Sequence, residues 1–298
     1  MANFLLILIC FVAGFVMRKT KVLQDGSHLG INAWIIYVAL PAAALFYLPK
    51  ITWSNDLWLP VLTPLICWIG AWVLTQSVQR YFKFDRPTRA GFLIVTGLGN
   101  TSFIGFPLIS AYYGEEYLSI AAIVDQANFF LLAVFASFVA MKNEPGGNVS
   151  LKFILRKLVT FPPFFALPLA FVLPRYMDMT QIEPLFKTLA ATLSPLAIFS
   201  VGIQFELKDL KSIWKPVAAA SIYKLILSPI LVLLLALLLN ITGMPRTISV
   251  FEAGMGTMIS AGILNDQFNL NPKLSNTIVF TTILLSFLTS GVLYGVMG

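Results

Sequence analysis

Charged side chains are scarce in this sequence of 298 residues, at 11% against about a quarter in ordinary soluble domains. Hydrophobic residues make up 58% of the chain. A soluble domain could not bury that much apolar surface, so the composition excludes an ordinary water-soluble fold. Membrane-spanning helices of about 20 apolar residues would account for almost the whole chain. The composition therefore predicts an all-α integral membrane protein with a lipid bilayer as its surroundings.

Residues that usually carry catalytic or metal chemistry are also nearly missing. The chain has one histidine, His28, and two cysteines, Cys10 and Cys67, which both lie in apolar runs. They provide no disulfide framework, no zinc-ligand spacing and no Ser/His or Cys/His pair. Gly-x-Ser-x-Gly and His-Glu-x-x-His motifs are absent as well. We expect neither an enzyme nor a resident metal or cofactor.

The net charge of +7 reflects membrane topology rather than nucleic-acid binding, because no long basic tract or aromatic-basic platform occurs. Apolar runs bounded by charges and turn residues predict ten spans, at about 3–17, 29–48, 57–79, 88–112, 117–141, 152–173, 181–204, 213–240, 245–265 and 272–297. Most basic residues follow odd-numbered spans, for example Arg18, Lys19 and Lys21, and Arg80, Lys83, Arg86 and Arg89. The positive-inside rule then predicts a multi-pass protein of the cell (inner) membrane with both termini extracytoplasmic.

Two glycine-rich segments reveal an internal repeat. The glycines of Gly97–Gly105 in the fourth span match those of Gly254–Gly262 in the ninth at one constant offset. Leu40-Pro41 and Ser194-Pro195 form a similar pair in the second and seventh spans. The halves 1–145 and 146–298 are therefore repeats of five spans each. Because five is odd, the second half enters the membrane from the opposite side, which is typical of secondary transporters.

The paired glycines predict interruptions in both spans, since glycine within a helix costs about 1 kcal/mol relative to alanine. An interruption in lipid is tolerated where it is buried in protein or lines a wet cavity, and there the N-termini of the half-helices attract anions. The candidate substrate-binding residues beside the interruptions are Gly99, Asn100, Thr101, Ser102, Gly256 and Thr257. The alternative is that these small residues only allow close helix packing.

Three charged residues lie about 10 to 14 Å inside predicted spans: Asp125, Lys224 and Glu252. Ionised groups at this depth cost at least about 2.5 kcal/mol, so they face a cavity, pair with one another or mark an ion pathway. Glu252 precedes the second interruption and is a candidate proton or cation site; alternatively, it forms a structural ion pair with Lys224. Asp125 is either functional or a hydrogen-bonded structural carboxylate. Gln126 and Asn128 are further polar candidates in the fifth span.

The sequence resembles the auxin efflux carrier family, which includes the plant PIN carriers and bacterial malonate-type permeases. The resemblance runs through the whole chain and is carried by Asn-Thr-x-x-x-Gly-x-Pro-Leu at 100–108, Leu40-Pro41, Glu252–Met255 and Ala261–Leu264. It implies a fold like that of sodium/proton antiporters and bile-acid symporters, with crossed broken helices in spans four and nine. It also implies a scaffold of spans one, two, six and seven, a transport domain of spans three to five and eight to ten, homodimerisation and elevator-type alternating access.

The same resemblance makes Asn100 the contact for a substrate carboxylate and makes Pro41 and Pro195 kinks that line the site. Plant carriers have proline where this chain has Gly99 and Gly256, which favours a small carboxylate other than auxin. We therefore expect a secondary active transporter of a small mono- or dicarboxylate. Glu252–Met255 also resembles the ion-binding stretch of bile-acid symporters, so Na⁺ and H⁺ are both candidate coupling ions. The alternative function is a cation/proton antiporter that uses Asp125 and Glu252.

Overall fold

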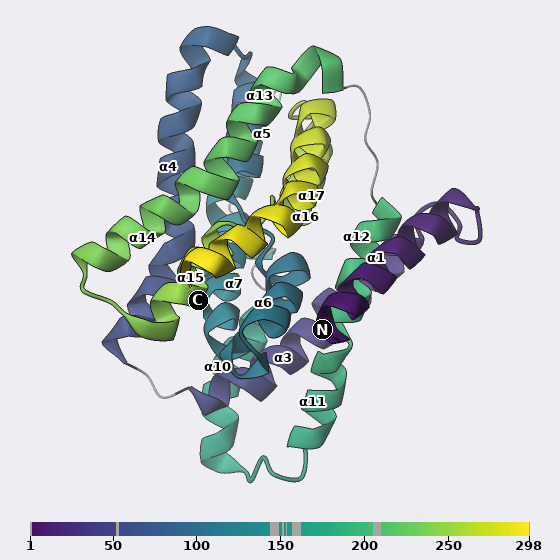
Figure 1. Cartoon of the computed structure of the whole chain (residues 1–298), viewed down its shortest axis with the longest axis vertical. Helices are drawn as coiled ribbons and strands as arrows, with labels where there is room; N and C mark the ends of the chain where they lie inside the picture. The colour runs from purple at the N-terminus through teal and green to yellow at the C-terminus, as the bar shows by residue number, and fades with distance from the viewer. Residues whose placement is uncertain are drawn as a thin grey trace. The chain divides into compact units, whose positions relative to one another are not determined.

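The computed structural model describes residues 2–51, 54–143, 149–150, 152, 154–156, 162–204 and 210–297, and the regular elements among them are helices joined by turns and short extended segments. Its α-helices are α1 (Ala2–Lys19), α2 (Ser27–Trp34), α3 (Leu40–Tyr47), α4 (Trp58–Phe82), α5 (Arg86–Gly97), α6 (Phe106–Tyr112), α7 (Leu118–Leu131), α8 (Ser137–Asn143), α10 (Pro162–Tyr176), α11 (Glu183–Ala191), α12 (Leu193–Gln204), α13 (Leu210–Ile222), α14 (Ser228–Leu238), α15 (Gly243–Ala253), α16 (Ile259–Gln267) and α17 (Pro272–Met297) (Figure 1). The predicted all-α class is confirmed for these residues.

Several helices are joined end to end by short turns of other helix types. The π-helical turns are η1 (Ile35–Ala39), η4 (Thr101–Gly105), η6 (Leu132–Ala136) and η7 (Tyr223–Leu227). The 3₁₀ turns are η2 (Leu48–Lys50), η3 (Asn55–Leu57) and η5 (Glu115–Tyr117). A π turn takes one residue more than an α turn, so it changes which side chains face the neighbouring helices.

Among the described residues, six helical stretches are long and apolar enough to cross a membrane: Ser27–Lys50, Asn55–Phe82, Glu115–Asn143, Glu183–Gln204, Ile213–Leu238 and Pro272–Met297. Shorter helices occupy the other expected spans, with α5 and α6 in the fourth and α15 and α16 in the ninth. The sixth expected span lies partly outside the described residues. The total of ten spans stays a prediction.

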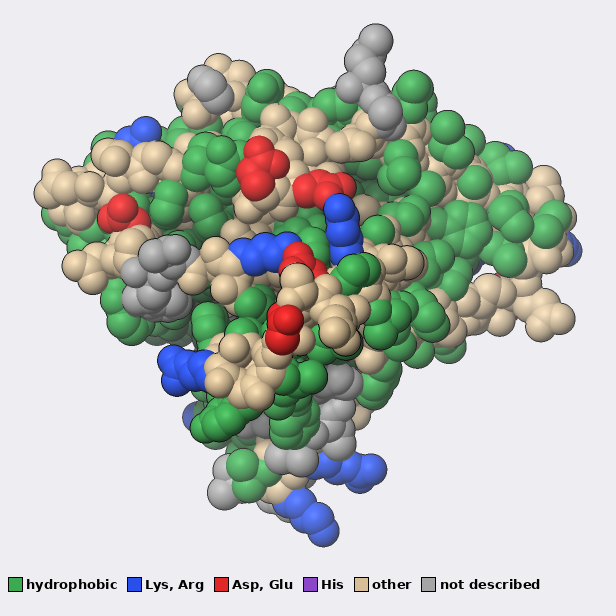
Figure 2. Space-filling view, turned by 90° about the horizontal axis from the view of Figure 1, so that it is seen from below, with side chains coloured by type: hydrophobic (Ala, Val, Ile, Leu, Met, Phe, Trp, Pro, Cys, Tyr) green, Lys and Arg blue, Asp and Glu red, His purple; other side chains and the backbone are tan. Residues whose placement is uncertain are grey.

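Large apolar side chains are exposed along several helices. Ile9 in α1 is 64% exposed, and Leu288 and Val292 in α17 are 71% and 67% exposed. Hydrophobic side chains also cover much of the surface in Figure 2. Exposed apolar surface on this scale is unstable in water and suits contact with lipid chains.

The helices form two compact units. Unit 1 consists of 1–53, 102–126 and 159–206. Within it, α1 packs along α12, and α10 and α11 pack against α3. Gly14 and Gly202 lie at the α1–α12 contact, where a Cβ on either residue would come within 2.2 Å of a backbone carbonyl oxygen of the other helix. Glycine is thus what allows these two backbones to approach so closely.

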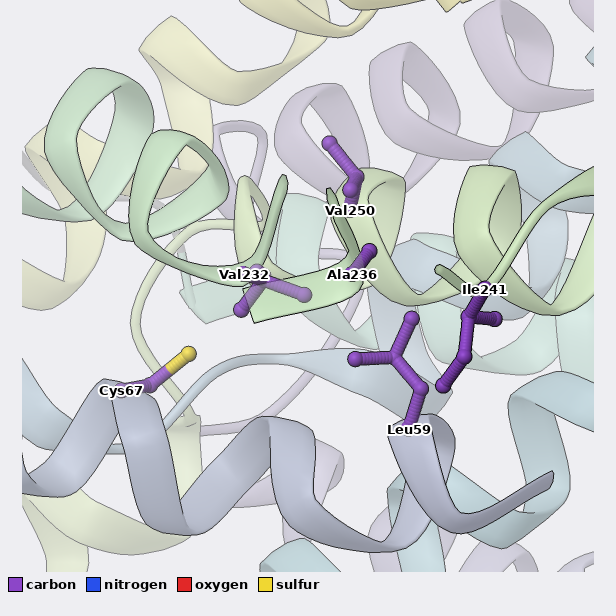
Figure 3. Close-up of a cluster of buried hydrophobic side chains, with 7 residues drawn as sticks. Leu59, Cys67, Val232, Ala236, Ile241 and Val250 are labelled. Carbon is purple, nitrogen blue, oxygen red and sulfur yellow. The ribbon is translucent and has the colours of Figure 1, made fainter. Parts of the chain in front are cut away.

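Unit 2 consists of 54–101, 127–158 and 207–298. Its helices α4, α14 and α15 enclose a hydrophobic cluster (Figure 3). The cluster consists of Leu59, Cys67, Val232, Ala236, Ile241, Val250 and Ala253. In the same unit, α17 packs against α5, α13 and α16. These contacts hold the interrupted helices α5 and α15 in a well-packed surrounding.

The two units divide the chain differently from the expected domains. The expected scaffold and transport domain each contain whole spans, whereas the unit boundaries pass through the fourth span after Thr101 and the fifth after Gln126. Packing within each unit does not reveal which helices move together, so the division into scaffold and transport domain stays a prediction. The expected repeat boundary at 145/146 lies outside the described residues.

Candidate functional site

Both glycine segments are interruptions between helices, as the sequence predicts. The first helix, α5, ends at Gly97, and its C-cap residue Leu98 is extended, with φ −105° and ψ 130°. Helical structure resumes at Thr101 with η4. The second helix, α15, ends at Ala253, and α16 begins after the extended Met258.

The two interruptions pair with each other in antiparallel fashion. The Asn100 amide donates to the Gly256 carbonyl at 2.7 Å, and the Met258 amide donates to the Leu98 carbonyl at 3.1 Å. Between these two bonds, Gly99 and Thr257 form an isolated β-bridge. We call the paired segments 98–100 and 256–258 the crossing. It satisfies backbone groups that neither interrupted helix could satisfy alone within lipid.

Two side chains from neighbouring helices fasten the crossing. Asn128 in α7 donates its amide to the Gly99 carbonyl at 2.6 Å. Thr282 in α17 accepts the Thr257 backbone N–H at 2.9 Å through its hydroxyl. Asn128 is 2% exposed and Thr282 is fully buried. Because each bond fixes a backbone group of the crossing, these contacts limit how far its two strands can shift.

Position 256 has no room for a side chain, so it requires glycine. A Cβ there would lie 2.7 Å from both the backbone N and the Cα of Ile283 in α17. A Cβ at Gly99 would lie 3.2 Å from the Lys224 ammonium nitrogen and 3.6 Å from the Glu252 carbonyl oxygen. The backbone of α17 therefore presses against one strand of the crossing, and the Lys224 side chain presses against the other.

Lys224 and Glu252 are the charged groups beside the crossing in unit 2. Each is 1% exposed. Their side chains are close enough to interact electrostatically. Both were singled out by the sequence because of their depth in apolar spans, and the structure brings them to the crossing. An opposite charge nearby lowers the cost of burying each ion.

A π turn aims Lys224 at the crossing. The residue lies in η7, between α13 and α14. On one side, the Tyr223 hydroxyl donates to the Cys67 carbonyl of α4, and on the other Ser228 donates to the Cys67 thiol at 3.0 Å. A Cβ at Gly70, one turn further along α4, would lie 2.4 Å from the Tyr223 hydroxyl oxygen. Hydrogen bonds to α4 thus hold η7 in place, and glycine at position 70 leaves the space that the Tyr223 side chain occupies.

Two helix beginnings flank the crossing. One is the start of η4 at Thr101, and the other is the start of α16 at Ile259. The first N–H groups of a helix have no intrahelical acceptor and carry the positive end of the helix dipole. Asn100 occupies the residue before the first of these beginnings and is 2% exposed. Ser102, in the first turn that follows, is equally buried and belongs to unit 1.

The other predicted site residues also belong to unit 1. Asp125 is fully buried and Gln126 is 6% exposed, both within α7. The Gln126 amide oxygen has no hydrogen-bond partner among the described residues. Pro41 occupies the first turn of α3 and Pro195 lies in α12.

Pro195 lines a pocket of about 140 Å³ within unit 1. Phe106, Pro107 and Ser110 of α6 form one wall, and Ser194 and Pro195 of α12 form another. The helix that continues from the first interruption therefore meets the predicted proline of the seventh span at a cavity. Pro41 does not line this pocket; Ala43 in the same helix does.

Sequence reasoning missed Thr282 and Met258 as parts of the crossing. Met258 contributes a backbone amide, for which side-chain chemistry gives no signal. Thr282 could have been found from the sequence, because it belongs to a series of buried hydroxyl residues on one face of α17. These residues are Ser275, Thr282, Ser286 and Ser290. Small polar residues at helical spacing in an apolar span indicate a face turned toward protein.

Comparison with known proteins agrees with this architecture. The sequence model of the family described as "Membrane transport protein" matches residues 1–294. An uncharacterized transporter of Methanocaldococcus jannaschii is 27% identical over 295 residues, covering 95% of this chain and 94% of its own length. A Rhizobium meliloti protein named "Putative malonate transporter" is 25% identical over 292 residues, covering 91% of this chain and 88% of its own. The chain is therefore a multi-pass membrane transporter rather than an enzyme, and it belongs to the auxin efflux carrier family of membrane transport proteins.

Proposed function

We propose that this protein is a secondary active transporter of a small organic anion, and that the anion's carboxylate binds at the crossing. The crossing itself carries the proposal: two helix beginnings flank an antiparallel pairing, with the Lys224 side chain against Gly99. The Rhizobium meliloti relative's name, which refers to malonate, supports a mono- or dicarboxylate as the substrate class.

Electrostatics favour an anion at this position. Each helix N-terminus stabilises a negative charge by about 0.3 to 2 kcal/mol, the upper end applying to partly buried sites. The Lys224 ammonium adds a full positive charge in surroundings of low dielectric. Asn100, directly before η4, is placed to donate its side-chain amide to a carboxylate oxygen. The candidate binding residues in unit 2 are thus Gly99, Asn100, Thr101, Gly256 and Thr257.

The coupling ion is proposed to act through Glu252. Its carboxylate is buried and interacts electrostatically with Lys224, so a proton or Na⁺ bound at Glu252 would remove a negative charge that opposes the binding of an anion beside the ammonium. In the alternative function, Asp125 and Glu252 exchange cations for protons without an organic substrate. The position of the Lys224 ammonium beside Gly99 favours the first scheme, because a positive charge at the crossing attracts an organic anion and repels a cation.

Uptake into proteoliposomes tests the function directly. Purified protein is reconstituted and supplied with labelled malonate and a panel of other mono- and dicarboxylates, with and without gradients of Na⁺ and H⁺. We expect uptake of at least one carboxylate, dependent on one gradient. Cation-driven proton movement of the same size in the absence of every carboxylate would instead identify an antiporter.

Asn100→Ala separates substrate binding from folding. We expect about a tenfold loss of apparent affinity, which corresponds to one hydrogen bond to a charged group. Asn55→Ala is the matched control, because Asn55 is exposed in η3. Unchanged affinity in Asn100→Ala would remove this residue from the binding site.

Glu252→Gln should alter the Na⁺ or pH dependence of uptake, and identical profiles would leave Glu252 with a structural role alone.

We further propose ten spans, both termini extracytoplasmic in the inner membrane, and an elevator-type movement within a homodimer. Orientation can be measured by labelling single cysteines, since Cys10 and Cys67 are the chain's own cysteines and can be replaced. Tyr81 and Tyr176 are 84% and 85% exposed and suit the introduced cysteines. A cysteine at position 81 should be labelled from the cytoplasm and one at 176 from outside. The reverse pattern would overturn the proposed orientation.

A further inference from the structure

Four helix ends of unit 2 meet around a groove of about 520 Å³. They are the end of α4 and the beginnings of α5, α13 and α17, which gather at the top of Figure 1. The residues that line the groove are Phe82, Lys83, Phe84, Asp85, Thr88, Ile213, Trp214, Lys215, Pro216, Asn271 and Leu274. Its volume lies in the range of sites that hold small ligands. We call it the lysine groove, and it is separate from the crossing.

The charge of the lysine groove favours an anion. Lys83 and Lys215 are both exposed and contribute two ammonium groups. Asp85 is the acidic residue in the lining, and its carboxylate already accepts the Thr88 backbone N–H at 3.1 Å as the N-cap of α5. Asn271 is likewise engaged, donating to the Thr88 hydroxyl and accepting the Leu274 backbone N–H. The Lys215 ammonium lies 5.9 Å from the centre of the Trp214 ring, a long contact that leaves its N–H groups able to bind an anion, so the two lysines are the groups in the lining best suited to a negatively charged ligand.

An apolar surface leads away from the groove along one helix. Trp214, at its rim, is 57% exposed, and the exposed residues Ile222, Ile226, Ile230 and Leu234 follow along α13, η7 and α14. Ile222, Ile226, Ile230 and Leu234 follow at intervals of four residues, so each side chain lies next to the one before it on the helix surface. A tryptophan at the end of a lipid-facing helix is typical of the interface between headgroups and acyl chains. The groove thus joins a cationic site to a strip that suits a hydrocarbon chain.

We propose that the lysine groove binds the phosphate of a membrane phospholipid, with one acyl chain lying along the strip that begins at Trp214. The ammonium groups of Lys83 and Lys215 bind the phosphodiester, and the exposed apolar residues of α13 and α14 contact the chain. Basic pockets between helices at the membrane surface bind such headgroups by the same chemistry. The site does not depend on which side of the membrane the groove faces.

Native mass spectrometry of the delipidated full-length protein in detergent tests the proposal. Phosphatidylglycerol is titrated against the parent and against the double variant Lys83→Gln/Lys215→Gln. We expect about 25-fold weaker binding in the double variant, from roughly a fivefold contribution by each lysine. Lys83→Arg/Lys215→Arg should restore binding, since arginine keeps the charge. Dihexanoyl phosphatidylglycerol should bind more weakly than the long-chain lipid, because it leaves the apolar strip uncovered.

Two controls test whether binding depends on the two groove lysines and on a lipid rather than a soluble anion. Lys273→Gln removes an exposed lysine near the same helix ends but outside the lining, and it should bind like the parent. Inorganic phosphate is the soluble competitor. Equal binding by parent and double variant would overturn the proposal. An equal loss of lipid binding in Lys273→Gln would also overturn it, because it would indicate an effect of diffuse surface charge. Complete displacement of the lipid by millimolar phosphate would overturn it as well, because it would assign the groove to a soluble anion.

Discussion

Replacing Gly256 with alanine tests whether the crossing depends on close backbone contact. The added methyl would lie 2.7 Å from backbone atoms of Ile283 and 2.8 Å from the carbonyl carbon of Thr282. These atoms belong to α17 and cannot move aside as the end of a flexible side chain can. Either α17 or the crossing must therefore shift.

The expected cost can be worked out from these contacts. Overpacking a close-packed interior costs about 1 to 3 kcal/mol, and an obstruction by backbone atoms belongs at the upper end. A shift at Gly256 also strains the bonds from Asn100 to Gly256 and from Thr257 to Thr282, each worth about 1 kcal/mol. We therefore expect Gly256→Ala to lower the free energy of unfolding by about 3 to 5 kcal/mol.

Thermal unfolding in detergent, followed by tryptophan fluorescence, measures the effect. At about 2 to 4 °C per kcal/mol, Gly256→Ala should unfold about 10 °C below the parent. Two other glycines provide a graded comparison. A Cβ at Gly262 meets only side-chain atoms, at 3.1 and 3.2 Å, so its change should be small. A Cβ at Gly295 meets nothing within 4 Å, and alanine there should stabilise α17 by about 0.5 to 1 kcal/mol. The reasoning fails if Gly256→Ala unfolds at the parent's temperature and transports normally.

Three further substitutions examine the surroundings of the crossing. Asn128→Leu removes the donor to the Gly99 carbonyl, and we expect a loss of about 2 kcal/mol in the same unfolding assay; a neutral result would mean that this bond is replaceable. Lys224→Gln should weaken carboxylate binding about tenfold, seen as a smaller ligand-induced rise in unfolding temperature, and an undiminished rise would argue against an attractive role for the ammonium. Tyr223→Phe loses the bond to the Cys67 carbonyl and should cost about 1 kcal/mol of unfolding free energy, with no change if η7 is held by packing alone.

The interruptions could be predicted from the sequence because glycine lowers the stability of a helix. Two pairs of glycines at matching positions of an internal repeat therefore indicate that both helices are broken there. The partner of each interruption could be inferred only from the repeat. The hydrogen bonds between Asn100 and Gly256 and between Met258 and Leu98 follow from the register of the two strands, which depends on three-dimensional packing. The helical class and the apolar spans follow from composition and periodicity, which are local properties.

The direction of the Lys224 side chain could not be predicted from the sequence. Its depth in an apolar span marked it as a functional candidate, but the direction of its side chain depends on the π turn η7. That turn is stabilised by Tyr223 and Ser228 bonding to Cys67, which lies far away in the sequence. Asn128 was likewise found as a polar residue in an apolar span. Its bond to Gly99 could not be foreseen, because periodicity identifies a helix face and not the atom that the face meets.

The mutual pairing at the crossing also sets an order of events during biosynthesis. The ribosome releases Leu98–Asn100 long before Gly256–Met258, so the earlier strand enters the bilayer without its hydrogen-bonding partner. Until the later strand arrives, its exposed amide and carbonyl must be hydrated or held by the insertion machinery, since lipid offers neither donor nor acceptor. A nascent chain stopped before Gly256 should therefore be a substrate for membrane proteases, and synthesis of the segment 256–258 is the step that completes the pairing of Leu98–Asn100.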